Sequence, residues 1–246
     1  SASGVQNSLL NAGDVVSVTA TFSEAVNVAS SNPTLTLVVG STNRTATYAS
    51  GSGSTDLVFR YTIQAGETDS DGISIGANAL ALNSSTIRDR ALNNATLTHV
   101  LVRDNSSVKV DTTAPSVDNF TMSDTELKIG DNATVTLEFS EPICANSSSP
   151  FNCLVVFTAS DIDNASGRLP TMSSLQDDDN KTIWTGTFTP YELTEVDVNR
   201  LSLSTNYTDL AGNRGPTAQT GIYDVDTRPP SVVGFFMSDR TLRRTD

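Results

Sequence analysis

The stretch Val110-Asp111-Thr112-Thr113-Ala114-Pro115-Ser116-Val117 decides how this chain is organised, because it occurs twice. It returns 115 residues later as Val225-Asp226-Thr227-Arg228-Pro229-Pro230-Ser231-Val232. Met-Ser-Asp follows each copy, starting at Met122 and at Met237. A repeat of this length is a whole domain rather than one turn of a solenoid.

Shorter matches extend the same repeat to the first half of the chain. Phe22-Ser23-Glu24 corresponds to Phe139-Ser140-Glu141, and the stretch from Asp89 to Asn93 corresponds to that from Asp209 to Asn213. We therefore expect two tandem domains, repeat one (residues 1–114) and repeat two (residues 115–229). Residues 230–246, here called the tail, match the opening strand of repeat two and so begin a third copy.

The local pattern predicts strands and no amphipathic helix. Apolar, often β-branched residues alternate with polar ones, and Gly-, Asn-, Asp- and Ser-rich turns separate the runs. About seven short strands in a domain of this size are typical of an immunoglobulin-like antiparallel β-sandwich. The expected strands are Val15–Phe22, Leu35–Val39, Arg44–Ala49, Leu57–Ile63 and Thr96–Val102 in repeat one, and Ala133–Phe139, Leu154–Thr158, Gly167–Met172, Thr182–Phe188, Arg200–Ser204 and Thr220–Val225 in repeat two.

The composition excludes several classes of protein. The net charge is −13, which argues against nucleic-acid binding and favours cationic partners. No apolar run is long enough for a membrane span, so we expect no membrane insertion in this segment. The chain starts at Ser1 without Met, which indicates a processed product or a segment of something longer.

Two features indicate an extracellular or cell-surface protein. Cys144 and Cys153 are close enough for one local disulfide, although two free thiols in a reducing cell are the alternative. Asn-X-Ser/Thr sequons are about twice as frequent as the four or five that chance alone would give. Glycans would cover turns and strand edges, while chance in a Ser/Thr-rich bacterial protein is the plain alternative. The sequons are at Asn43, Asn83, Asn94, Asn105, Asn119, Asn132, Asn146, Asn164, Asn180 and Asn206.

Asp-Thr-Thr-Ala-Pro at Asp111, Phe-Ser-Glu at Phe22 and Phe139, and Asp-Leu-Ala-Gly-Asn at Asp209 carry a family likeness. They resemble the bacterial Ig-like extender domains that stand in tandem in large calcium-dependent surface adhesins. This resemblance covers nearly the whole chain. It implies a structural role, in which the domains hold a binding head away from a cell and calcium stiffens the joints.

Acidic residues at predicted strand ends and in the loops next to them are candidate calcium ligands. Calcium requires oxygen ligands, and the ends of sandwich strands can converge on one pole. We expect Glu24, Asp89, Asn93 and Asp111 to converge in repeat one, and Glu141, Asp209, Asn213 and Asp226 in repeat two. Asp69 and Asp71 form a second candidate. The alternative for all of these is that they only make Asx-turns and cap strand ends.

Catalysis has little support in the sequence. His99 is the only histidine, which speaks against His-based triads and multi-His zinc sites. Trp184 is expected in the core rather than at a ligand surface. We therefore expect no enzyme but a secreted, N-glycosylated structural module of a fibre, filament or stalk, whose partners are neighbouring Ig-like repeats or identical subunits. The alternative is a calcium-dependent adhesin segment with its own ligand-binding surface.

The tail has two interpretations. The chain can be a window cut from a longer array, or the tail can complete a sheet in a neighbouring subunit by strand addition. Its apolar residues Val232, Val233, Phe235, Phe236 and Met237 favour burial over exposure.

Overall fold

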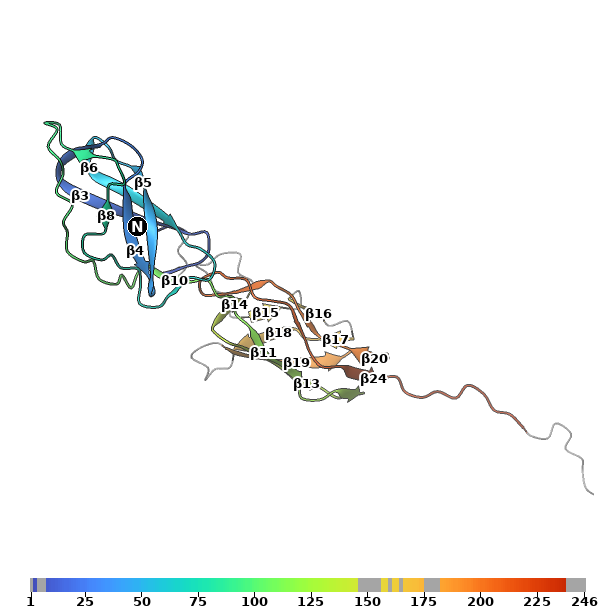
Figure 1. The fold of residues 1–246 in the computed structure, drawn as a ribbon. Helices are drawn as coiled ribbons and strands as arrows, with labels where there is room; N and C mark the ends of the chain where they lie inside the picture. The colour runs from blue at the N-terminus through green and yellow to red at the C-terminus, as the bar shows by residue number, and fades with distance from the viewer. Residues whose placement is uncertain are drawn as a thin grey trace, which may run out of the picture.

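A computed structural model of the chain describes residues 2–3, 8–145, 156–158, 161–163, 166–174 and 182–237. Every regular element in these ranges is a strand, and the two repeats lie end to end (Figure 1). Among these residues there is no helix with the length and apolarity that crossing a bilayer requires. The part of the tail that is described, residues 230–237, extends from the end of repeat two that lies farther from repeat one (Figure 1).

Repeat one consists of two sheets. In the larger sheet, β9 (Ile87–Arg88) also pairs with β3, and the other strands follow the order β1 (Ala2–Ser3), β3 (Val15–Val28), β6 (Ser54–Thr62), β5 (Thr42–Ser50), β4 (Thr34–Val39) and β8 (Leu80–Ala81). The smaller sheet has the order β2 (Leu9–Leu10), β10 (Lys109–Asp111) and β7 (Thr68–Asp69).

Repeat two follows a similar plan with shorter strands. Its main sheet has the order β11 (Val117–Met122), β13 (Ala133–Phe139), β19 (Ile183–Pro190), β18 (Thr171–Ser174) and β15 (Val156–Thr158), and β17 (Gly167–Arg168) also pairs with β19. The remaining strands form the groups β12 (Glu126–Lys128), β24 (Tyr223–Asp226) and β20 (Glu195–Asn199); β14 (Ile143–Ala145) and β22 (Tyr207–Asp209); and β16 (Ile162–Asp163), β21 (Ser202–Leu203) and β23 (Ala218–Gln219).

Alternation of side chains explains how these strands build a core. In β13 the residues at positions 133, 135, 137 and 139 are buried, while the intervening ones are not, as expected for a strand with one face inward. Each repeat encloses a separate core, one from Leu10 to Val110 and the other from Phe120 to Val225. Trp184 is fully buried in the second core, edge-on to Phe157, which confirms its expected place. The chain is therefore all-β, as the sequence predicted, and consistent with Ig-like sandwiches.

Several details differ from the sequence-based expectation. The expected strand Gly167–Met172 is divided between β17 (Gly167–Arg168) and β18 (Thr171–Ser174). Within the described residues, each repeat contains one parallel pair, β2 with β10 and β12 with β24, in a fold expected to be antiparallel. The expected strand Thr96–Val102 is wrong, because a strand exists only through hydrogen bonds to a neighbour. This segment makes one isolated bridge, between Val102 and Ile75. Leu154 and Val155 of another expected strand lie outside the described residues.

Candidate metal centre

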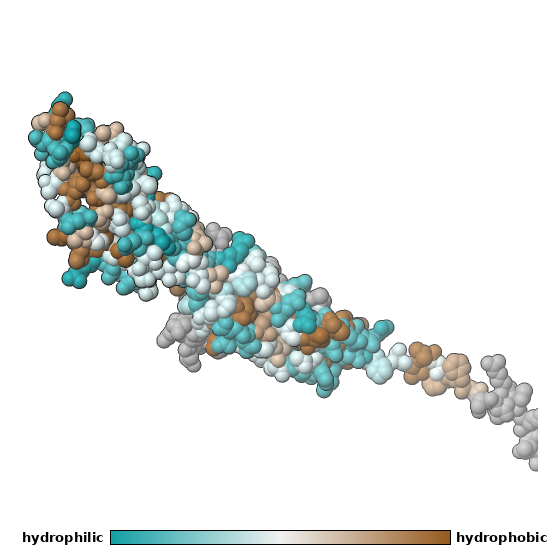
Figure 2. All heavy atoms as spheres, in the orientation of Figure 1, coloured by the Kyte–Doolittle hydropathy of each residue, from teal (hydrophilic) through white to brown (hydrophobic). Residues whose placement is uncertain are grey.

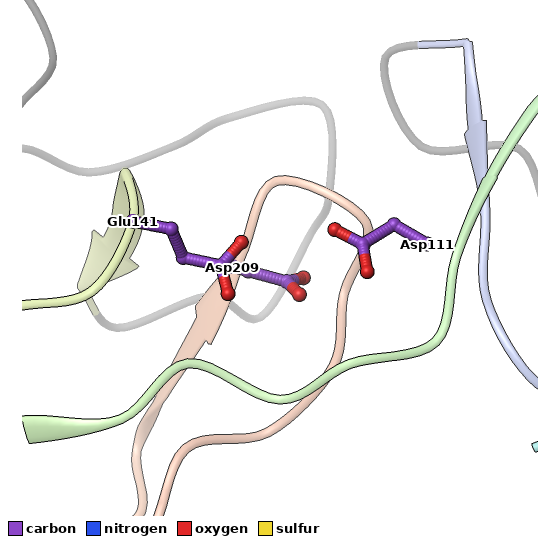
Figure 3. Close-up of side chains that lie close together, drawn as sticks. All are labelled: Asp111, Glu141 and Asp209. Atoms are coloured by element: carbon purple, nitrogen blue, oxygen red, sulfur yellow. The ribbon is translucent and has the colours of Figure 1, made fainter. Parts of the chain in front are cut away.

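Three carboxylates meet where the two repeats join. One oxygen from each of Asp111, Glu141 and Asp209 lies within 4.8 Å of the other two. Figure 3 shows their side chains pointing toward one another from three separate segments. Asp111 ends β10 of repeat one, Glu141 stands between β13 and β14, and Asp209 ends β22. The cluster therefore combines the last strand of one repeat with two segments of the next.

Local hydrogen bonds hold Asp209 in place. One carboxylate oxygen accepts from the backbone N–H of Asn213 at 2.8 Å, and the other accepts from its Nδ2 at 2.7 Å. Asp89 and Asn93 make the same pair of bonds in repeat one, at 2.8 and 2.7 Å. The motif from Asp to Asn therefore forms a turn. This is the Asx-turn that the alternative interpretation of these residues predicted.

In repeat two the same amide also reaches the linker between the repeats. Asn213 Nδ2 donates to the carbonyl oxygen of Asp111 at 2.8 Å and to that of Thr113 at 3.1 Å. Pro115, which follows in the linker, is buried. These contacts fix the chain direction at the joint, and they carry Asp111 to the carboxylates of repeat two.

The linker is also attached to the repeat that it leaves. Thr112 Oγ1 accepts from the Gly66 N–H at 2.9 Å and donates to the Glu67 carbonyl at 2.9 Å. Thr227 repeats this role, accepting from the Thr194 N–H at 2.9 Å and donating to the Tyr191 carbonyl at 2.6 Å. Sequence reasoning missed this function of the threonine, although its recurrence after Asp in both copies was a signal for it.

The cluster carries a strong excess of negative charge. Burial, followed by the charges of Asp209 and Asp111, raises the pKa of Glu141 from 4.5 to about 7. Burial also raises the pKa of Asp209, although its bonds from Asn213 act in the opposite direction. None of the salt bridges found among the described residues involves these three carboxylates. Such a site gains stability from a cation that compensates the charge.

The residues fit a hard divalent cation. Oxygens that share one Ca²⁺ lie about 2.4 Å from it, so no two of them are farther apart than about 4.8 Å. Three carboxylates, mono- or bidentate, supply three to six of the roughly six to eight oxygens that Ca²⁺ takes, and water can supply the rest. If calcium binds at this joint, Asp111, Glu141 and Asp209 are the residues that hold it.

The grouping of ligands that the sequence predicted needs correction at two positions. Asp111 lies with Glu141 and Asp209 of repeat two rather than with Glu24, Asp89 and Asn93. Asp226 is likewise not at this pole, since it pairs with Lys128 and Glu195 at another part of repeat two. The reason is that the last strand of a repeat ends at the pole that faces away from that repeat's own cluster. Its terminal Asp therefore lies beside the carboxylates of the repeat that follows. Glu24, Asp89 and Asn93 do share one hollow of repeat one.

The second calcium candidate, Asp69 with Asp71, is arranged differently. Asp69 is buried, and its two oxygens accept from the N–H groups of Gly72 at 2.7 Å and Gly40 at 2.8 Å. Asp71 is exposed. This geometry explains Asp69 as the anchor of two turns, and it places no third carboxylate beside the pair in the described part of the chain.

The remaining predicted sites are the sequons, the two cysteines and His99, and most of them lie in the described residues. Seven sequon asparagines are exposed, namely Asn43, Asn83, Asn94, Asn105, Asn119, Asn132 and Asn206, while Asn146, Asn164 and Asn180 lie outside the described residues. Cys144 is disulfide-bonded, and Cys153 also lies outside the described residues. His99 Nε2 accepts from the Ala79 N–H at 2.8 Å, so the ring has a structural partner.

Comparison with known families concerns repeat two. Residues 111–225 match the family model described as a bacterial Ig-like domain, and the match includes Asp111 with repeat two. No curated protein matches the chain. Domains of this family are generally not enzymes; they are structural or adhesion-type modules and often occur in surface proteins. The chain therefore carries a bacterial Ig-like domain at residues 111–225.

Proposed function

We propose that the chain is a non-enzymatic structural module of an extracellular fibre, filament or stalk, with a joint that calcium stiffens. The observation that carries this proposal is the position of Asp111, which belongs to β10 of repeat one but lies within 4.8 Å of Glu141 and Asp209 of repeat two. A cation held by all three would connect the repeats directly. Bending the joint would then break ligand bonds, so the bound state is the stiffer one.

The other contacts of the joint would also resist bending between the two repeats. Thr112 attaches the linker to repeat one, and Asn213 attaches it to repeat two. Pro115 restricts the backbone between these points, because its ring fixes φ. A short linker attached at both ends favours an extended arrangement over a loose tether.

Surface position and glycosylation belong to the same proposal. The exposed sequon asparagines are spread over both repeats and stand on strands, turns and loops. Glycans at such positions would shield strand edges from pairing with other chains. The disulfide at Cys144 suits an oxidising compartment.

Calcium titration of the full chain tests the proposal. In wild-type protein, calcium should raise the unfolding temperature of repeat two, and small-angle scattering should show a narrower range of inter-repeat distances than in EDTA. Glu141→Gln should remove most of both effects, since it deletes one charged ligand. Glu24→Gln is the matched control, because Glu24 occupies the corresponding position of repeat one away from the joint.

The two outcomes are clearly separated. Loss of the calcium response in Glu141→Gln but not in Glu24→Gln supports a cation at the joint. A wild-type unfolding temperature and scattering profile that are the same in calcium and in EDTA would remove calcium from the proposal.

A further inference from the structure

Glu67 is a buried carboxylate that joins the two sheets of repeat one. It is only 4% exposed. Its Oε1 accepts hydrogen bonds from Arg44 Nε in β5 and from the hydroxyl of Tyr61 in β6, and its Oε2 accepts one from the Gln64 N–H at 2.9 Å. Glu67 itself stands directly before β7 of the smaller sheet. Through the group of Glu67, Arg44 and Tyr61, here called the Glu67 cluster, the larger sheet holds the start of a strand of the smaller one.

The Glu67 cluster stabilises the ionised form of its carboxylate. Burial acts to raise the pKa of Glu67, but the bonds from Tyr61, Gln64 and Arg44 outweigh burial, so this pKa lies below its ordinary value. Burial, followed by the bond and the charge of Glu67, raises the pKa of Tyr61 to about 12, so at neutral pH the hydroxyl keeps its proton and donates. Removing one partner from a buried charge is strongly destabilising. The three side chains therefore hold one another in one arrangement.

The buried carboxylate differs from the charges on the surface around it. Figure 2 shows hydrophilic residues gathered on the end of repeat one that lies next to repeat two. Water screens exposed charges, so ion pairs on such a surface contribute little to a defined geometry. A charge fixes the backbone around it where burial excludes this screening, as it does for Glu67.

The Glu67 cluster fixes the turn that binds the linker. The Glu67 N–H donates to the Gln64 carbonyl at 3.3 Å, and the Glu67 carboxylate accepts from the Gln64 N–H, so the turn is closed from both sides. Gly66 within it has a φ of 87°, which a residue with a side chain rarely adopts. The same turn binds Thr112 Oγ1 through the Gly66 N–H and the Glu67 carbonyl. The groups that hold the Glu67 carboxylate therefore also hold the linker.

The path from Glu67 to the candidate metal centre is short. Thr68, the next residue, pairs with Asp111 in the ladder between β7 and β10. Thr112, which the turn binds, follows Asp111 directly. Asp111 is thus held from two directions by the segment that starts at Glu67. The position of that segment sets where the Asp111 carboxylate lies relative to those of repeat two.

Repeat two shows that binding a linker threonine does not by itself require such a cluster. In the register of its strands, Thr194 stands at the position of Glu67. Thr194 still binds the linker threonine Thr227, without a carboxylate. The ion pair beside it, Arg228 with Glu195, is exposed, with nitrogen and oxygen 4.0 Å apart. Binding the threonine and attaching the turn rigidly to the larger sheet are therefore separate features, and Glu67 supplies the second.

We infer that the Glu67 cluster is a positioning device for the joint, since it fixes the turn that sets where the Asp111 carboxylate lies. The inference rests on the proposed function, in which calcium binds at Asp111. A ligand displaced by a fraction of an ångström binds its cation less well, so residues behind the ligands contribute to affinity without touching the cation. Calcium binding at the joint therefore depends on a carboxylate of repeat one that is not a ligand.

Calorimetric calcium titration of the full chain, at a temperature at which the variants are folded, tests the inference. Glu67→Gln keeps the size of the side chain but removes the charge that holds Arg44 and Tyr61. It should weaken calcium binding by about tenfold. Tyr61→Phe removes one bond to the carboxylate and should weaken binding in the same direction by a smaller factor. This milder variant carries the test if Glu67→Gln does not fold.

Ile87→Val is the control for a general loss of stability. Ile87 is buried in the same core, and its strand, β9, pairs with β3 rather than with β7 or β10. This variant should lower the urea midpoint of repeat one and leave the calcium affinity unchanged. If Glu67→Gln and Tyr61→Phe also lower the midpoint without changing the calcium affinity, the cluster is only structural and the inference fails.

A double-mutant cycle tests whether Glu67 acts through Asp111. Asp111→Asn alone should weaken calcium binding, because it removes a charged ligand. Adding Glu67→Gln to Asp111→Asn should then cost much less than Glu67→Gln costs in the wild type, since the group that Glu67 positions has already been altered. Losses that multiply, as they do for independent sites, would overturn the path through Asp111.

Hydrogen exchange in EDTA separates this inference from the calcium proposal. Without calcium, Glu67→Gln should speed amide exchange in residues 66–69 and 110–113 relative to both the wild type and Ile87→Val. A wild-type chain that binds no calcium, together with this change in exchange, removes calcium from the proposed function and keeps the positioning of the linker. Unchanged exchange in these residues overturns the inference, whether or not the chain binds calcium.

Discussion

Asn213 donates a hydrogen bond from Nδ2 to the carbonyl oxygen of Asp111 at 2.8 Å, although the two residues are 102 positions apart and belong to different repeats. The bond joins a turn of repeat two to the end of the last strand of repeat one. It explains why a turn motif and a linker motif recur together in this chain. The turn of one repeat is shaped to receive the linker of the repeat before it.

Asn213→Ala should therefore weaken repeat two more than Asn93→Ala weakens repeat one. Asn213 Nδ2 makes bonds to Asp111, Thr113 and Asp209, while Asn93 Nδ2 makes the bond to Asp89. With a net value of about 0.5–1.5 kcal/mol for each bond, we expect a difference of about 1–3 kcal/mol. Urea unfolding, with the two repeats followed separately, measures it, and equal losses would argue against a stabilising joint.

Thr112→Val should loosen the linker from repeat one. The substitution keeps the shape of the side chain but removes the hydroxyl that binds Gly66 and Glu67. We expect a loss of about 1–2 kcal/mol in the free energy of unfolding of repeat one. Thr113→Val is the control, because the side chain of Thr113 is exposed and its hydroxyl makes neither of these bonds. The idea fails if both variants unfold at the same urea concentration.

Asp209→Asn should lower calcium affinity, whereas Asp89→Asn should not in the monomeric chain. Both substitutions remove one charged oxygen from the same kind of turn, so their effects on the turns should match. Only Asp209 lies beside two further carboxylates, Asp111 and Glu141. Isothermal titration with calcium should show a weakening of about tenfold or more for Asp209→Asn. A similar change in both variants would place the cation elsewhere.

Without calcium, repeat two should become less stable as the pH rises from about 4.5 to about 7. Burial and the charges of Asp209 and Asp111 raise the pKa of Glu141 to about 7, so in this interval the folded state holds a proton that the unfolded state has lost. This stabilisation is full below about pH 4.5 and disappears as the pH passes 7. Urea midpoints in EDTA should follow that course and become flatter in Glu141→Gln.

Calcium should oppose this pH dependence. The cation binds the ionised carboxylates, so its affinity rises as Glu141 loses its proton. Urea midpoints measured in saturating calcium should therefore fall less, or even rise, over the same interval. A pH profile that is identical with and without calcium would count against Glu141 as a ligand.

Native material should carry N-linked glycans on the exposed sequons. Enzymatic removal of such glycans leaves an aspartate in place of each occupied asparagine, and this change marks the site for mass spectrometry. We expect occupied sites in both repeats, among them Asn43 and Asn206, which are exposed. An unchanged intact mass after the treatment would remove glycosylation from the proposed function.

Several features of the fold could be predicted from the sequence because they depend on local pattern. The alternation in Ala133–Phe139 predicted the bounds of β13, since side chains in a strand point alternately to the two faces. Segment Thr96–Val102 has a comparable pattern but is not a strand. Whether an alternating segment becomes a strand depends on an available neighbour, and the pattern itself does not contain that information.

In the candidate site, too, the local turns could be predicted from the sequence, but the contacts between distant residues could not. Asp89 with Asn93 and Asp209 with Asn213 could be identified as recurring acidic turns from their spacing alone. Their partner could not, because Asp111 leaves repeat one at the pole where repeat two begins. Assigning it to its own repeat was the natural choice from the sequence, and the direction of the last strand makes that choice wrong.

The amino-acid sequence by itself determined that this protein is all-β and repeats one pattern at an offset of 115 residues, because alternation and repetition are properties of the chain. Only the tertiary structure decided which strand ends lie next to one another. It brought Asp111 to the carboxylates of the following repeat. Such contacts depend on the direction in which each strand leaves its sheet, and that direction is set by packing across the whole domain.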